Sequence, residues 1–181
     1  MPTAKLLQIS QIGHPVLREK TKLVENVRGR SIQNLINDMK YTCADANGVG
    51  LAAPQVYQPL KLFIASSRPL PPVYRNEPEI ELKAFINPEI VSESDEKIPN
   101  WESCLSIPGI RGLVLRPKSI DVRYTNSEGQ IEERTFEGLM ARVFKHEKEH
   151  LDGVLYTDYT DPKTFMSEKE YQKMVTEMNK K

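Results

Sequence analysis

The sequence predicts an α+β protein that forms a single domain over residues 1–181. Apolar side chains recur at helical spacing in three stretches and at strand spacing in several short runs between them. No internal repeat, low-complexity segment or linker-like composition divides the 181 residues. A chain of this length buries roughly 70% of the surface that its unfolded form exposes, so it can build its own core.

Composition and charge exclude several classes of protein. The 25 Lys and Arg residues balance the 25 Asp and Glu residues, which argues against a nucleic-acid binder or a polybasic membrane protein. No apolar run approaches the roughly 20 residues of a spanning helix. The N-terminus also lacks a basic segment followed by an apolar one. We therefore expect a cytoplasmic protein in which Cys43 and Cys104 are reduced.

The first predicted element is a helix over residues 31–47. Ser31 is its expected N-cap and Gly48 its expected stop. Cys43 lies on the apolar stripe, so we expect it to be a small core residue. The side chains of this stripe are Ile32, Leu35, Ile36, Met39, Cys43 and Ala46.

Short strands are predicted between this helix and the next one. In the run that begins at Lys118, apolar and polar side chains alternate, which is typical of a half-buried strand. The turn residues 126–129 join it to the following run, which indicates an antiparallel hairpin. Residues 68–79 hold four prolines and predict an irregular surface loop. The predicted strands are Lys61–Ala65, Ala84–Val91, Lys118–Thr125 and Gln130–Phe136.

Two further helices are predicted, one from about Gly138 to Asp152 and one at about 167–179. Gly153 is the expected left-handed residue that ends the earlier of the two. The later one places four apolar side chains on one face, where we expect packing contacts. They are Tyr171, Met174, Val175 and Met178.

The helix at 138–152 carries the residues with the clearest chemistry. His146 and His150 lie one turn apart on its apolar stripe, and Glu147 lies beside the first of them. Two imidazoles at this spacing can bind one metal ion, while the glutamate can act as a base on metal-bound water. Charged side chains on a core-facing stripe are costly unless they are paired or bound to metal. The expected solvated side carries Lys145, Lys148, Glu149 and Asp152.

A metal site of this kind needs a third protein ligand. The extended pattern with a third histidine is excluded because position 156 is Tyr156. A glutamate about twenty residues beyond the second histidine is one candidate, and Glu170 lies there. Cys104 in the segment NWESCLSIPG is the other.

Three segments in order resemble the peptide deformylase family. They are GVGLAAPQ at 48–55, ESCLS at 102–106 and HEKEHLDG at 146–153. The resemblance extends to GHPVLRE near the N-terminus, INPEI at 86–90 and IPGIRGLVLRP at 107–117. Three motifs in the family's order are far more specific than any one of them alone.

The resemblance implies a fold, a reaction and a ligand set. The fold is α+β, with antiparallel strands around a central helix that bears the HExxH motif. The reaction removes the N-formyl group from new proteins that begin with formylmethionine and releases formate. The implied metal ligands are Cys104, His146 and His150. The implied metal is one divalent ion, natively Fe²⁺ in much of the family, and zinc, nickel or cobalt can occupy such a site.

The resemblance also assigns catalytic roles. A hydroxide held on the metal attacks the formyl carbon, and Glu147 takes the proton of the water and later gives it to the leaving amine. The oxyanion that develops needs donors placed in advance. The implied donors are the side-chain amide of Gln55 and the backbone N–H of Leu105.

Further residues are implied to contact the substrate. The segment Gly48, Val49 and Gly50 suits a peptide that runs beside it as an added strand. Apolar Leu139 and Val143 are candidates for the methionine pocket, with Trp101 near its rim, although core packing explains these side chains equally well. Arg111 matches a family arginine near the substrate, with a structural ion pair as the alternative. The partners implied are nascent formylmethionyl peptides and the ribosome near its exit tunnel, with no nucleic-acid motif and no membrane.

The sequence departs from the family pattern at three places. Ser103 stands where glycine is usual, and a backbone with positive φ at this position would be strained by serine. Lys145 and the pair Lys148–Glu149 are also unusual, and we expect them on the outer face of the helix. A zinc peptidase that uses Glu170 is the alternative enzyme. A deformylase-like protein with an altered substrate or a binding-only role is the other alternative, and only Ser103 favours it.

Overall fold

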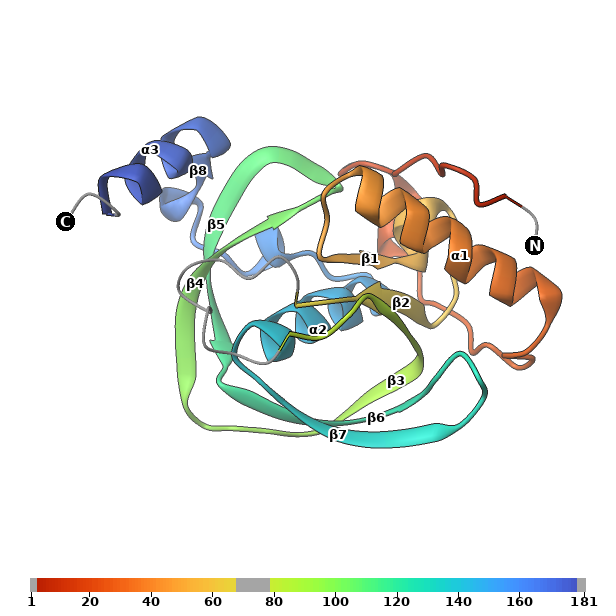
Figure 1. Ribbon diagram of the computed structural model, residues 1–181. Helices are drawn as coiled ribbons and strands as arrows, with labels where there is room; N and C mark the ends of the chain where they lie inside the picture. Colours follow the sequence, from red (N-terminus) through yellow and green to blue (C-terminus); the bar gives the residue numbers. More distant parts are fainter. Residues whose placement is uncertain (1–2, 68–78, 179–181) are drawn as a thin grey trace.

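The computed structural model describes residues 3–67 and 79–178, and its fold is α+β as predicted (Figure 1). Its α-helices are α1 (Arg30–Asp45), α2 (Gly138–Leu151) and α3 (Glu168–Met178). Short 3-10 helices are η1 (Pro15–Arg18), η2 (Ala53–Val56), η4 (Tyr156–Asp158) and η5 (Pro162–Thr164). The loop predicted at 68–79 lies, up to residue 78, outside the described residues. None of the described helices is both long and apolar enough to cross a membrane.

A five-stranded antiparallel sheet forms the larger layer. Its order is β1-β2-β3-β6-β7, so β1 lies at one edge. All four predicted strands occur in it, with ends that differ by one or two residues, and β6 and β7 form the predicted hairpin. The bounds are β1 (Gly50–Ala52), β2 (Leu62–Ala65), β3 (Lys83–Glu93), β6 (Ser119–Thr125) and β7 (Ile131–Glu137).

The two faces of this sheet bury different helices. Phe63 of β2 packs in a cluster with Phe144 of α2. Its neighbour Ile64 points the other way and packs in a cluster with Met39 and Cys43 of α1. The alternation follows from the two-residue period of a strand, which sends adjacent side chains to opposite faces. Helix α2 is therefore held against the inner face of the sheet, where its polar residues are carried into the interior.

The second sheet has the order β4-β5-β8 and is antiparallel. Its strands are β4 (Lys97–Cys104), β5 (Ile107–Pro117) and β8 (Met166–Ser167). None of them was predicted from the sequence. Prolines and glycines interrupt the alternation in β4 and β5 and weaken such runs as strand candidates, and β8 is only two residues long. The register shifts between Glu102 and Cys104, so residues 108–111 have no partner in β4. Ile110 and Arg111 pair with β8 instead, directly before α3.

Both ends of α1 differ from the prediction, whereas the C-terminal end of α2 agrees with it. Helix α1 begins at Arg30 with Gly29 as its N-cap, two residues earlier than an N-cap at Ser31 would place it. It is Asn47, at φ 52°, that takes the left-handed conformation after α1, a role that asparagine tolerates, so the prediction of Gly48 was one residue late. Helix α2 ends as predicted, with Gly153 at φ 75° and the N–H of Val154 donating to the carbonyl oxygen of Glu149.

Candidate functional site

Three possible metal ligands from two elements meet in the interior. Cys104 ends β4, and His146 and His150 lie one turn apart in α2. One ligand atom from each lies within 4.8 Å of the others, and all three residues are buried. The Sγ of Cys104 is 3.3 Å from Nε2 of His150. Tetrahedral ligands with metal bonds of about 2.0–2.3 Å stand about 3.3–3.8 Å apart, so this donor set fits a divalent transition metal.

A buried acidic residue orients the first histidine. Glu102 of β4 lies 2.9 Å from Nδ1 of His146, which leaves Nε2 of that ring free to face the site. The same carboxylate accepts two hydrogen bonds of 2.8 Å from Arg116 and one of 2.7 Å from Arg142. Glu102 and both arginines are buried. We call Glu102, Arg116, Arg142 and the carboxylate of Glu149, which also accepts from Arg116, the buried charge cluster.

Sequence reasoning assigned no role to Glu102, Arg116 or Arg142. The signal was present in part, because Glu102 opens the quoted ESCLS segment. What was missing is the pairing, since Arg116 and Arg142 lie 14 and 40 positions from Glu102 in the chain. Glu149 was predicted on the solvated side of α2. That prediction is wrong for Glu149, because its side chain is half-buried and accepts hydrogen bonds from Arg116 and Tyr159.

The charge cluster sets the electrostatics around the two histidines. Burial would raise the pKa of Glu102, but hydrogen bonds from Arg116 and His146 hold it well below its usual range. Burial would lower the pKa of His146, but Cys104 and Glu102 raise it well above its usual value in the metal-free protein. Burial and the charge on His146 lower the pKa of His150. Nδ1 of His150 has no hydrogen-bond partner within the described part of the chain.

Glu147 lies beside the ligands without joining the charge cluster. It is buried, and its Oε2 has no hydrogen-bond partner among residues 3–67 and 79–178. Burial raises the pKa of this carboxyl to about 7, which suits a group that both accepts and returns a proton. A Cβ built on Gly50 would lie 2.7 Å from Cδ of Glu147. Glycine at position 50 is therefore explained by the packing of Glu147 against β1.

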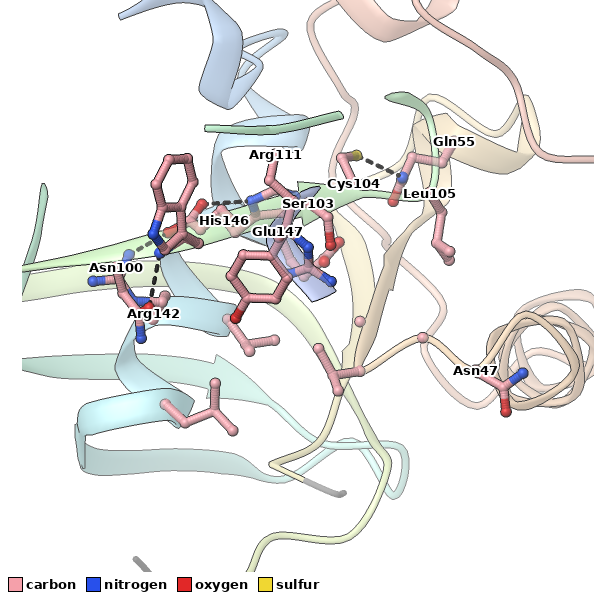
Figure 2. A pocket seen from close by; sticks show the side chains of 18 residues that line it. Asn47, Gln55, Asn100, Ser103, Cys104, Leu105, Arg111, Arg142, His146 and Glu147 are labelled. Carbon is pink, nitrogen blue, oxygen red and sulfur yellow. Dashed lines mark hydrogen bonds and ion pairs between the residues drawn. The ribbon is translucent and has the colours of Figure 1, made fainter. Parts of the chain in front are cut away.

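The amide of Gln55 is fixed in orientation. Its Oε1 accepts from the backbone N–H of Ala52 at 2.7 Å, so its Nε2 faces the other way. That nitrogen donates to Oγ of Ser106 at 3.0 Å and lies 3.5 Å from Sγ of Cys104. Figure 2 shows Gln55 and Cys104 joined by this contact, with Leu105 next to them. Both implied oxyanion donors thus lie close to the sulfur.

One cavity of about 340 Å³ connects these groups with every residue expected to contact the substrate. Figure 2 shows His146 and Glu147 between Gln55 and Leu105 on one side and Asn100 and Arg142 on the other. The expected substrate residues that line the cavity are Gly48, Val49, Gly50, Arg111, Leu139 and Val143. Trp101 and Tyr171 also line it. The sequence left the role of the C-terminal helix open, and the structure places Tyr171 of this helix at the cavity as well as against Trp101.

The structure decides two expectations, one about the backbone at Ser103 and one about Glu170 as a metal ligand. Ser103 lies within β4 and is not among the residues with positive φ, so serine causes no backbone strain there. Glu170 is exposed on α3 and pairs with Lys173, and it does not belong to the cluster of possible ligands found in the described residues. The alternative of a peptidase with Glu170 as third ligand is therefore wrong.

Comparison with known proteins agrees with this geometry. The family model for polypeptide deformylase matches residues 6–166. The chain belongs to this family. Members of the family are metal-dependent enzymes that remove N-formyl groups from nascent peptides. The matched region contains both ligand-bearing elements and ends before α3 begins.

Individual relatives are similar over most of the chain. A peptide deformylase 2 of Nostoc sp. is 49% identical over 177 residues, which cover 97% of this chain and 98% of the relative. The crystal structure of peptide deformylase from Thermotoga maritima has a TM-score of 0.78 and 36% identity, covering 87% of this chain and 99% of that one. A Met-Ala-Ser-bound class I type b peptide deformylase from Acinetobacter baumannii has a TM-score of 0.81 and 34% identity, covering 86% and 99%.

Proposed function

We propose that this chain hydrolyses the N-formyl amide of peptides that begin with formylmethionine and releases formate and a free amine. The observation that carries this proposal is the buried Glu147, whose Oε2 has no hydrogen-bond partner within the described residues, beside the Cys104–His146–His150 cluster. Glu147, Cys104 and His146 line one cavity. Membership of the peptide deformylase family supports the same reaction. The described ligands come from β4 and α2, so we also infer that one domain holds the whole site.

The metal would be held by Cys104, His146 and His150. A divalent ion bound there would lower the pKa of a bound water and polarise the formyl carbonyl. We propose Fe²⁺ as the native ion because of the family resemblance, with zinc, nickel or cobalt as ions that the site can also hold. The metal content of protein purified without oxygen tests the choice. Zinc in place of iron in such a preparation would contradict it.

Glu147 is the proposed proton carrier. Its pKa of about 7 lets it take a proton from the attacking water and remain able to release it. The water oxygen adds to the formyl carbon, the carbon–nitrogen bond breaks, and the same proton passes to the departing amine. Because no described hydrogen bond restrains Oε2 of Glu147, this oxygen is available to the water.

The negative charge that develops on the formyl oxygen requires donors. Nε2 of Gln55 is held toward Cys104 by the contact of Oε1 with Ala52. We assign it, with the backbone N–H of Leu105, as the pair that stabilises this charge. Donors fixed before the reaction add no reorganisation cost when the charge forms.

The substrate would enter along β1. This strand lies at the edge of the five-stranded sheet, so its outer backbone groups can pair with an extended peptide. Gly48, Val49 and Gly50 line the cavity at that edge. Leu139 and Val143 of α2 offer an apolar wall for the methionine side chain. We further propose that the protein works in the cytoplasm on chains leaving the ribosome near its exit tunnel, and sedimentation with ribosomes tests that contact.

The decisive experiment measures formate release from formyl-Met-Ala-Ser by metal-loaded protein. Glu147→Gln should lower kcat by about 10²–10⁴ because the proton carrier is lost. Glu133→Gln, at an exposed ion pair, is the matched control and should leave the rate unchanged. Metal analysis of both variants separates loss of the base from loss of the ion. Absence of formate from fully metallated native protein that binds the peptide would support the binding-only alternative instead.

A further inference from the structure

Helix α3 is attached to the rest of the protein by a small set of contacts. None of its side chains is buried. Strand β8, two residues long, pairs with Ile110 and Arg111 directly before it. Arg111 donates to both carboxylate oxygens of Glu168 at 2.6 and 3.2 Å, and its guanidinium carbon lies 4.1 Å from the ring centroid of Tyr171. In Figure 1, α3 projects from the end of β5 rather than covering the core.

These contacts place one face of α3 at the cavity that holds Glu147. Tyr171 lines this cavity, and its ring centroid lies 6.2 Å from that of Trp101 on β4. Trp101, Tyr171 and Arg111 thus form an aromatic and cationic rim, in which the charge of Arg111 is balanced by Glu168. Among the described lining residues, these two rings are the large aromatic surfaces of the cavity. The ligands and Glu147 lie deeper, since they are buried.

We propose that Tyr171, together with Trp101, binds the residues that follow methionine in the substrate, and that Arg111 and Glu168 are positioning residues that hold Tyr171 there. This proposal rests on the proposed function, because it concerns the same cavity. A peptide whose formyl group reaches Glu147 must leave the cavity toward solvent, and rings at a rim bind passing backbone and side chains with little loss of entropy. Helix α3, which lies beyond the matched family region, then determines selectivity for peptide length.

The test compares two substrates that share the reacting end. Formyl-Met-amide stops before the rim, and formyl-Met-Ala-Ser reaches it. We expect Tyr171→Ala to lower kcat/KM for the longer substrate about five- to tenfold through KM, as for removal of an aromatic contact. For the shorter substrate, kcat/KM of this variant should change less than about twofold. Tyr171→Phe should restore the native ratio, because it keeps the ring.

Two controls keep this test decisive. Tyr41→Ala removes an exposed tyrosine from α1 and should leave kcat/KM unchanged for both substrates. Trp101 is the single tryptophan of the chain, so its fluorescence reports peptide binding at the rim without turnover. Titration with Met-Ala-Ser should show about five- to tenfold weaker binding to Tyr171→Ala than to native protein.

The outcomes separate the two proposals. If native protein turns over neither substrate but binds Met-Ala-Ser through Tyr171, the proposed reaction is wrong and the rim assignment stands. If Tyr171→Ala lowers kcat/KM equally for both substrates, or binds Met-Ala-Ser as tightly as native protein does, the rim assignment is overturned. Glu168→Gln should shift the substrate ratio in the same direction by about two- to threefold, since one partner of Arg111 becomes neutral.

Discussion

Two ion-pair systems contribute residues to the lining of the cavity, and their burial differs sharply. In the buried charge cluster, the side chains of Arg116 and Glu102 are 1% and 5% exposed. At the rim, those of Arg111 and Glu168 are 21% and 40% exposed. The buried system surrounds a histidine that faces the metal site, while the rim system attaches a helix. The comparison shows that similar arginine–carboxylate geometry serves rigidity in one place and attachment in the other.

The physical difference is the cost of losing one partner. A buried charge whose partner is removed has no water to replace it, so the loss is large. An exposed pair is screened by water and salt, and its contribution is small.

The largest effect is expected for Glu102→Gln. The change leaves Arg116 and Arg142 with less negative charge around them in the interior, and it should lower the free energy of unfolding by about 3–5 kcal/mol. It should also weaken metal binding about 10–100-fold, because His146 loses the carboxylate that orients its ring. Urea unfolding of the metal-free protein and competition with a chelator measure the two effects. The exposed variant Glu133→Gln provides the baseline, and a Glu102→Gln protein as stable as that one would refute the contrast.

Gly50→Ala should have the next largest effect. Its new Cβ would overlap the Glu147 carboxyl. Such overpacking typically lowers the free energy of unfolding by about 1–3 kcal/mol. We expect kcat to fall while metal content stays constant, because Glu147 must move and the ligands need not. Formate release and metal analysis on the same samples check this. Native kcat in this variant would show that Glu147 tolerates displacement.

Glu149→Gln probes the outer end of the buried cluster. Arg116 would lose one charged acceptor at 2.6 Å but keep both bonds to Glu102. The expected loss of stability is about 1–2 kcal/mol, less than the full value of about 1.5–3 kcal/mol for a hydrogen bond to a charged group, because the glutamine oxygen can still accept from Arg116. Thermal unfolding measures it. A loss as large as that of Glu102→Gln would mean that the cluster fails as a unit.

The smallest effect is expected at the rim. Glu168→Gln should cost less than about 1 kcal/mol at neutral pH, and less still in high salt. A hydrogen bond from Arg111 lowers the pKa of Glu168, so its stabilising contribution is present above the unfolded pKa and disappears as pH falls through the lower folded pKa. The difference in Tm between native protein and Glu168→Gln should therefore vanish in acid. A difference that grows below pH 4 would contradict this assignment.

Sequence alone determined the local parts of this protein. The spacing of apolar residues located the three α-helices and four of the strands in the described part of the chain, because each kind of element repeats its buried side chains at a fixed step along the sequence. It also placed His146, Glu147 and His150 on the face of α2 that is buried. Where prolines and glycines break the alternation, as in β4 and β5, the same reasoning failed.

Tertiary structure decided which distant residues meet. Cys104 reaches His150 across 46 positions, and Arg111 reaches Glu168 across 57. No local period encodes such contacts, because they depend on how β4, β5 and α3 pack after they form. The resemblance to a family supplied Cys104, but nothing in the sequence analysis predicted the buried charge cluster or Tyr171 at the rim. The register shift after Glu102 leaves Arg111 without a partner in β4, and Arg111 pairs with Met166 of β8 instead.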